Sequence, residues 1–153
     1  MFDRILVVCT GNICRSPIGE QLLQQALPNK HIASAGVATE RSGLNGHDID
    51  NDAAQVARDS GMTLAPHQAQ QLTSELVNNH DLILVMEQRH KEIISERYPQ
   101  ARGKLMRYGE WLARPEGGTG KDIADPYKKS LESHQQVFNE LKQASASWTQ
   151  KLN

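Results

Sequence analysis

A cysteine and an arginine near the N-terminus have the types and the spacing that phosphate chemistry requires. Cys9 and Arg15 are six positions apart. A thiolate can attack phosphorus, and a planar guanidinium can pair with two phosphoryl oxygens at once. Gly11 can adopt positive φ angles without steric cost, and Asn12 tolerates them better than most residues, so the backbone can curve around an anion. The stretch therefore predicts an anion-binding loop around a nucleophilic thiol, formed by Thr10, Gly11, Asn12, Ile13, Cys14 and Ser16.

The surrounding residues predict a turn from a strand into a helix. The apolar run Ile5-Leu6-Val7-Val8 is typical of a strand that is covered on both faces, and helical spacing follows after Pro17. The first N–H groups of a helix have no partner within it, so phosphate binds there readily, and the same positive field favours a thiolate. We expect Ser16 to cap this helix and Pro17 to lie in its first turn. In the alternative interpretation, Cys9 only ends a core strand.

Composition and charge limit the class of protein. The 153 residues are 38% apolar and 23% charged, as in a globular chain, and we expect a single domain over residues 1–153. The formal net charge of −1 provides no general basic field for nucleic acid or an anionic membrane. The two cysteines lie in one loop, which is no extracellular disulfide framework. Strand-like sequence begins at Arg4 and no apolar run reaches about eighteen residues, so we expect no signal peptide, no membrane insertion and a cytoplasmic location.

Strand and helix patterns alternate along the chain. Apolar strand patterns occur at residues 5–8, 30–35, 82–86 and 104–108. The alternation with helices predicts an α/β fold, a three-layer sandwich with a central four-stranded parallel sheet and helices on both faces. Right-handed crossovers place the phosphate loop, which follows the first strand, at the carboxyl edge of the sheet, where such folds bind ligands.

Capping residues predict where several helices begin or end. Gly61 is expected to end the helix before it, and Thr73 or Ser74 to cap the next one. Ser133 with Gln136 resembles a capping box at the start of the long C-terminal helix.

A second stretch with chemical potential lies in the long segment between Gly109 and Ser133, where secondary-structure signals are weak. It contains Asp125-Pro126-Tyr127. A thiolate that displaces phosphate from an alcohol or phenol needs an acid to protonate the leaving oxygen, and an aspartate before proline is held extended, which aims its carboxyl group outward. The alternative is an ordinary Asp-Pro turn.

Together the two stretches resemble the low-molecular-weight protein tyrosine phosphatases. That family has Cys, five residues, Arg and Ser near its N-terminus and Asp-Pro-Tyr late in the chain, as at Cys9, Arg15, Ser16 and 125–127 here. Further similarities are Ser34-Ala35-Gly36, the segment around His67, and the strand at residues 81–86. The resemblance thus extends over nearly the whole chain.

The resemblance implies a role for each matching residue. Cys9 would be the nucleophile, Arg15 the phosphate ligand and Asp125 the general acid. Tyr127 would form a wall for the substrate ring. Ser34 and His67, with Asn12 and Ser16, would hold the loop in shape by hydrogen bonding, although each could be an ordinary structural polar group. No cofactor and no metal is expected, because Arg15 and the loop amides supply the positive field.

The segment 125–130 is most similar to bacterial members of the family that act with capsule or exopolysaccharide autokinases. This implies a phosphotyrosine protein as partner, with the cytoplasmic tail of a membrane tyrosine autokinase as one such protein. Lys128 stands where many animal members have a second tyrosine, and this would weaken an aromatic clamp on that side.

Several alternatives stay open. Cys14 either packs or forms a reversible disulfide with oxidised Cys9, which would protect Cys9 from overoxidation. An arsenate reductase on the same scaffold would need further cysteines, and a binding module without turnover would need neither Cys9 nor Asp125. Gly118-Thr119-Gly120-Lys121 lacks the remaining residues of a nucleotide-binding loop, and the six histidines show no metal-ligand spacing.

Overall fold

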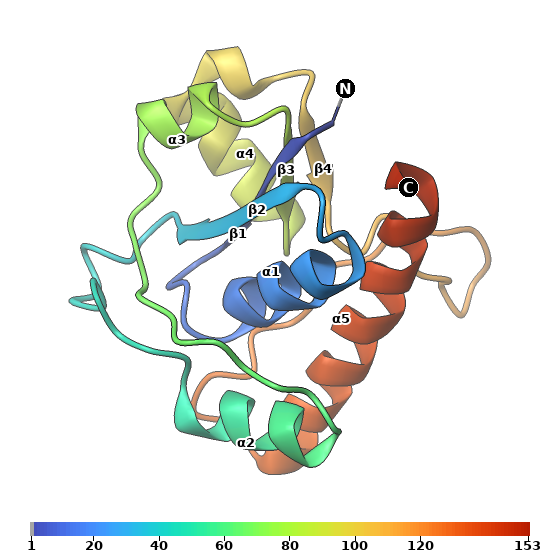
Figure 1. Ribbon diagram of the computed structural model, residues 1–153. Helices are drawn as coiled ribbons and strands as arrows, with labels where there is room; N and C mark the ends of the chain where they lie inside the picture. The colour runs from blue at the N-terminus through green and yellow to red at the C-terminus, as the bar shows by residue number, and fades with distance from the viewer. Residues whose placement is uncertain (1) are drawn as a thin grey trace.

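Four parallel strands form the centre of the protein in the computed structural model, which describes residues 2–153 (Figure 1). The sheet order is β2-β1-β3-β4. Its strands are Arg4–Cys9 (β1), His31–Gly36 (β2), Leu82–Val85 (β3) and Leu105–Arg107 (β4). The two central strands are the most apolar, because both of their faces are covered.

Helices cover both faces of this sheet (Figure 1). Successive β1 side chains point to opposite faces, so Ile5 and Val7 join one core while Leu6 and Val8 join the other. The first core is closed by Arg15–Ala26 (α1), Asn51–Asp59 (α2) and Leu131–Leu152 (α5). The second is closed by Ser74–Asn78 (α3), Gln88–Arg97 (α4) and the 3₁₀ turn Pro99–Ala101. The predicted three-layer α/β fold is confirmed.

The predicted helix caps agree with the structure at two helices and fail at two. The Thr73 hydroxyl caps α3 by accepting from Leu76 N at 3.2 Å, and Gly61, at φ +95°, follows the end of α2. The predicted cap at Ser16 is wrong, because α1 begins at Arg15 and no side chain caps it.

The predicted capping box at Ser133 is also wrong. Helix α5 begins at Leu131, and Ser130 caps it by accepting from Ser133 N at 3.1 Å. Ser133 therefore belongs to the first turn of the helix, where its N–H needs a partner and Ser130 supplies it.

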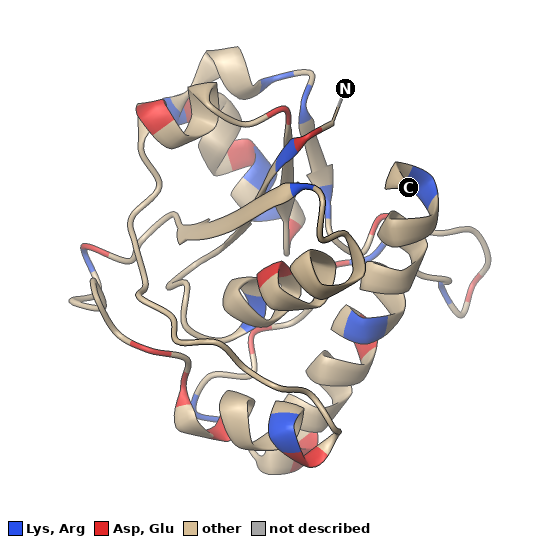
Figure 2. Ribbon diagram, viewed as in Figure 1, with Lys and Arg blue, Asp and Glu red and all other residues tan. Residues whose placement is uncertain are grey.

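Between β4 and α5 the chain forms a small hairpin beside the C-terminal part of α5 (Figure 1). An antiparallel bridge joins Ala113 to Thr119, and Arg114 N donates to Gly118 O at 3.0 Å. Trp111, next to the hairpin, packs edge-on against Trp148 of α5, and the two ring centroids are 5.6 Å apart. Basic and acidic residues are interspersed along the elements (Figure 2). None of the helices within residues 2–153 is both long and apolar enough to cross a membrane.

Candidate active site

The predicted phosphate loop connects the carboxyl end of β1 to the first turn of α1. Cys9, the last residue of β1, and Arg15, the first of α1, are almost completely buried. The turn depends on Asn12, which adopts φ +62°. Gly11, which we expected to provide such a conformation, is not among the positive-φ glycines of residues 2–153. A Cβ atom there would lie 2.9 Å from Leu44 Cδ1, so the end of the leucine side chain would have to shift.

Two donors stabilise the sulfur of Cys9. Asn12 N donates to Cys9 Sγ at 3.3 Å, and Ser16 Oγ lies 2.9 Å from the same sulfur. The Asn12 side chain donates to Ser16 Oγ at 2.8 Å, so the hydroxyl hydrogen of Ser16 remains for the sulfur. The hydroxyl that we expected to cap α1 is thus directed at the thiol. Two hydrogen-bond donors therefore point at the sulfur.

Buried hydrogen bonds hold Asn12 from several directions. Its side chain donates to Ser34 Oγ at 2.9 Å and accepts from Gln70 N at 2.9 Å. Its carbonyl oxygen accepts from His67 Nε2 at 2.7 Å. The structure therefore brings Ser34 and His67 to the loop. Sequence reasoning missed Gln70, whose contact is made by a backbone N–H and so leaves no side-chain signal.

The Arg15 guanidinium is clamped from outside the loop. Its Nη1 donates to Glu87 Oε2 at 2.5 Å and to Ile123 O at 2.7 Å. Burial tends to raise the pKa of Glu87, but hydrogen bonds from Arg15 and Arg89 outweigh it and hold that pKa below its usual range. An ionised carboxylate therefore fixes the arginine. Sequence reasoning missed Glu87, although its place directly after the β3 segment puts it at the same sheet edge as Cys9.

Helix α4 also supports the loop through His90, a third residue that sequence reasoning missed. The ring is completely buried, its Nδ1 accepts from Glu87 N at 3.2 Å, and its Nε2 lies 2.9 Å from Thr10 Oγ1. Because Nδ1 accepts, the proton is on Nε2, which donates to Thr10. Burial, and next the charge of Arg15, lower the pKa of His90 to about 4, so the ring is neutral at pH 7.

Asp125 reaches the mouth of the pocket from the loop before α5. Its Oδ2 lies 3.9 Å from Arg15 Nη2, and its side chain is 45% exposed. Oδ1 accepts from Tyr127 N at 3.0 Å, which fixes the turn around the proline. Just before this turn, Ile123 N donates to Met86 O at 2.9 Å, so the segment is attached to the end of β3. The predicted nucleophile, arginine and acid therefore share one site.

The pocket above the thiol also contains Tyr127 and residues that the sequence did not indicate. It is lined by Cys9, Thr10, Gly11, Ile13, Cys14, Arg15, Ser42, Leu44, Asp125, Tyr127 and Lys128. Tyr127 is 38% exposed and stands at the rim, as its predicted role requires. A second groove runs along Val37, Arg41 and Tyr98, and no cysteine lines it. Leu44 and Ser42 come from a polar, glycine-containing loop, whose composition gives no signal for a pocket wall.

Cys14 is a buried thiol beside this pocket. Burial, followed by the negative charges of Asp50 and Cys9, raises the pKa of Cys14, so this thiol is protonated at neutral pH. Both cysteines are free in the structure. A disulfide between them stays a prediction.

Comparisons with known proteins agree with this geometry. A family model described as low molecular weight phosphotyrosine protein phosphatase matches residues 4–153. A putative low molecular weight protein-tyrosine-phosphatase of Klebsiella pneumoniae is 49% identical over 152 residues, which cover 99% of each chain.

Solved structures extend the agreement to the backbone. Wzb of Vibrio vulnificus, in complex with benzylphosphonate, has a TM-score of 0.91 and 46% identity over 99% of both chains. The tyrosine phosphatase Wzb of Escherichia coli K30, in complex with sulphate, has a TM-score of 0.91 and 48% identity over 100% of both chains. The chain therefore belongs to the low-molecular-weight phosphotyrosine protein phosphatase family and is a protein-tyrosine phosphatase.

Proposed function

We propose that the protein hydrolyses phosphotyrosine in two displacements through a phosphocysteine intermediate. In the first, the Cys9 thiolate forms an S–P bond while the P–O bond to the phenol breaks, and Asp125 gives its proton to the leaving oxygen. In the second, Asp125 takes a proton from water, whose oxygen forms a P–O bond while the S–P bond breaks. The observation that carries the proposal is the convergence of Cys9, Arg15 and Asp125 in one pocket.

The loop is suited to stabilise the transition state of both steps. The backbone N–H groups of residues 10–15 and the Arg15 guanidinium surround the place of the three equatorial oxygens. Glu87 and Ile123 O already fix the guanidinium, so little reorganisation is needed when charge develops. Ser16 lies 2.9 Å from the sulfur and stabilises it as the leaving group of the second step.

The rim of the pocket favours an aromatic leaving group. Tyr127, Leu44 and Ile13 offer apolar surface above the thiol. The Vibrio vulnificus relative binds benzylphosphonate, in which one methylene group joins a phosphonate to a phenyl ring, so it resembles the end of phosphotyrosine. These features support a phenolic phosphate as the substrate.

We extend the proposal to the partner and the setting. The resemblance of residues 125–130 to capsule- and exopolysaccharide-associated members favours the tail of a tyrosine autokinase as the phosphoprotein. Two free thiols support a cytoplasmic location, with residues 1–153 acting as one phosphatase domain.

The test measures hydrolysis of a phosphotyrosine peptide without added metal and follows the covalent intermediate by rapid-quench mass spectrometry. Cys9→Ser should abolish both turnover and the phosphoenzyme. Asp125→Asn should lower kcat by about 10²–10⁴-fold, because the leaving phenolate is no longer protonated. Asp122→Asn is the matched control, since Asp122 lies in the same segment and is 47% exposed but does not line the pocket.

Each alternative has its own outcome. Turnover that survives Cys9→Ser would exclude the thiolate mechanism. Tight phosphate binding by the intact protein without any turnover would indicate a binding module. Thiol-dependent reduction of arsenate without peptide hydrolysis would indicate a reductase.

A further inference from the structure

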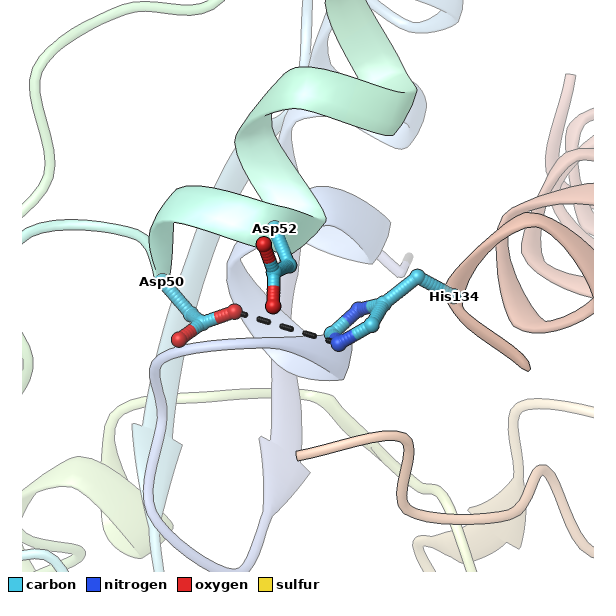
Figure 3. Close-up of side chains that lie close together, drawn as sticks. All are labelled: Asp50, Asp52 and His134. Atoms are coloured by element: carbon cyan, nitrogen blue, oxygen red, sulfur yellow. Dashed lines mark ion pairs between the residues drawn. The ribbon is translucent and has the colours of Figure 1, made fainter. Parts of the chain in front are cut away.

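Two carboxylates and an imidazole converge where the start of α2 meets the start of α5 (Figure 3). Asp50 precedes the first residue of α2 as its cap, and Asp52 lies in the first turn. His134 lies in the first turn of α5 and points toward both carboxyl groups (Figure 3). One ligand atom of each residue lies within 4.8 Å of the other two. The fold thus assembles a set of donors from two distant parts of the chain.

The imidazole nitrogen in this cluster needs a partner that the protein does not supply. The His134 side chain is 1% exposed, and its Nε2 has no hydrogen-bond partner within residues 2–153. The nearest carboxylate oxygen, Asp50 Oδ2, is 4.0 Å away, which is too far for a hydrogen bond. Buried polar atoms without a partner are rare in native proteins and require an explanation. The nitrogen is buried, aimed at two carboxylates and unpaired.

We propose that this cluster is a binding site for a divalent ion of the zinc type. His134 Nε2 and one oxygen each from Asp50 and Asp52 would be the ligands, and water would take the fourth position. Zn²⁺ accepts imidazole and carboxylate ligands together, whereas Mg²⁺ and Ca²⁺ prefer oxygen alone. With metal–ligand bonds of about 2.0–2.2 Å, ligand atoms around a tetrahedral ion are roughly 3.3–3.6 Å apart. Small side-chain rotations bring the present atoms to that separation.

The charges and hydrogen bonds of the site allow this ligation. Two carboxylates balance a divalent ion, although the N-terminal end of the α2 dipole opposes it. Asp50 also accepts from Ala53 N at 3.3 Å, but a carboxylate has about four acceptor positions, so capping and ligation can coexist. The carboxyl groups are therefore not committed to other partners in a way that excludes the ion.

The site lies outside the catalytic pocket but next to its supports. Asp50 N donates to Ile13 O of the phosphate loop at 2.8 Å. His134 lines a small apolar pocket together with Cys14 and Pro126, on the side of the loop that faces α5. An ion here would join α2 to α5 behind the loop and would take no part in the reaction. Its expected effect is a gain in stability.

The first experiment titrates the full reduced chain with Co²⁺, followed by Zn²⁺ as competitor. A tetrahedral N/O site gives visible d–d bands at one equivalent, and Zn²⁺ removes them. A thiolate ligand such as Cys9 would add an intense sulfur-to-metal charge-transfer band in the near ultraviolet, which we do not expect. Zn²⁺ at ten times its Kd should raise Tm by about 3–6 °C, because it binds the folded state alone.

Variants locate the ion. Asp52→Asn should weaken Co²⁺ binding by more than about tenfold, since even the outer partners of metal ligands contribute about 10–100-fold. It should leave metal-free peptide hydrolysis within about twofold of the wild type, as expected for a surface substitution. His134→Asn should also weaken Co²⁺ binding. If this substitution in the core makes the protein unstable, Asp52→Asn still tests the site. Asp59→Asn, on the same helix but outside the cluster, is the matched control and should bind normally.

Three results would overturn the proposal. One is the absence of both the visible bands and the Tm shift in the wild type. Another is equal affinity in the wild type and Asp52→Asn. The third is a charge-transfer band that disappears in Cys9→Ser, which would place the ion on the catalytic thiolate instead.

Discussion

The phosphate loop and the loop that carries Asp125 face the same pocket but are held in contrasting ways. Asn12 and Ser16 are completely buried and Arg15 is 1% exposed, and their side chains are hydrogen-bonded in the interior. Asp125 is 45% exposed, and its carboxyl group contacts mainly its own turn.

The two loops are held differently because they have different roles in the proposed reaction. Charge stabilisation requires donors that are already in place when the phosphoryl group arrives. Proton transfer requires only that one carboxyl group come within hydrogen-bond reach of the leaving oxygen, and a weakly held loop can also admit the substrate. We therefore expect substitutions in the first loop to affect both stability and rate, and substitutions in the second to affect the rate alone.

Arg15→Lys should have the largest effect. Lysine cannot span Glu87, Ile123 O and a phosphoryl group at once, because it offers a point charge instead of a planar fork. We expect kcat/KM for a phosphotyrosine peptide to fall by about 10³-fold, as on removal of an oxyanion donor. Tm should fall as well. A kcat/KM within tenfold of the wild type would contradict the inference that the fixed guanidinium of Arg15 is needed for the rate.

Asn12→Ala should lower the free energy of unfolding by about 3–4 kcal/mol. It leaves buried donors and acceptors without partners, and at φ +62° alanine is less well tolerated than asparagine. Asn12→Gly removes the same hydrogen bonds without the backbone strain, so it should be about 1 kcal/mol more stable than the alanine variant. Urea unfolding measures both. Equal stability of the two variants would show that the φ angle contributes nothing.

His90 should make the support of the phosphate loop sensitive to acid. Its pKa is about 4 in the folded protein and about 6.5 when unfolded, so the unfolded state binds more protons between these values. The stabilisation is complete above about pH 6.5 and is lost as the pH falls toward 4, by an amount on the order of 2–3 kcal/mol. His90→Asn should remove this part of the pH dependence. The free energy of unfolding is measured for both proteins from pH 4 to 7.5. Parallel curves for the variant and the wild type would contradict a contribution from His90.

Tyr127→Ala should have the smallest effect and the most selective one. Loss of an exposed ring at the rim should raise KM for an aryl phosphate by about 3–10-fold, equivalent to about 1 kcal/mol of aromatic contact. Tm should change by less than about 1 °C, since surface substitutions rarely alter stability. A clear loss of Tm would show that this loop shares the rigidity of the other.

The features that the sequence predicts are formed by residues close together in the chain. The strands around Ile5–Val8 and Leu82–Val85 are long buried apolar runs, and α5 repeats its apolar residues at helical spacing. The residues of the phosphate loop are adjacent in the chain, so their chemistry is visible as a motif. These features depend on local order and are predictable.

Contacts between distant segments are not visible in this way. Glu87 and Ile123 contact Arg15 only after β3 and the loop before α5 reach the same sheet edge. Ser16 carries a typical capping side chain, but a buried thiol competes for its hydroxyl and α1 remains uncapped. The spacing of the histidines indicates no metal site, because Asp50 and His134 meet only through the packing of α2 against α5.

The hairpin at residues 113–119 closes on itself through the Ala113–Thr119 bridge and is exposed throughout. Farther along the chain, both backbone polar groups of Ile123 are hydrogen-bonded: its N–H donates to Met86 O, and its carbonyl oxygen accepts from Arg15. These hydrogen bonds come after the hairpin in the chain. The position of Asp125 therefore does not depend on the length of the hairpin. The tip between Glu116 and Gly117 is consequently a place where a fluorophore or an affinity peptide can be inserted without displacing the acid.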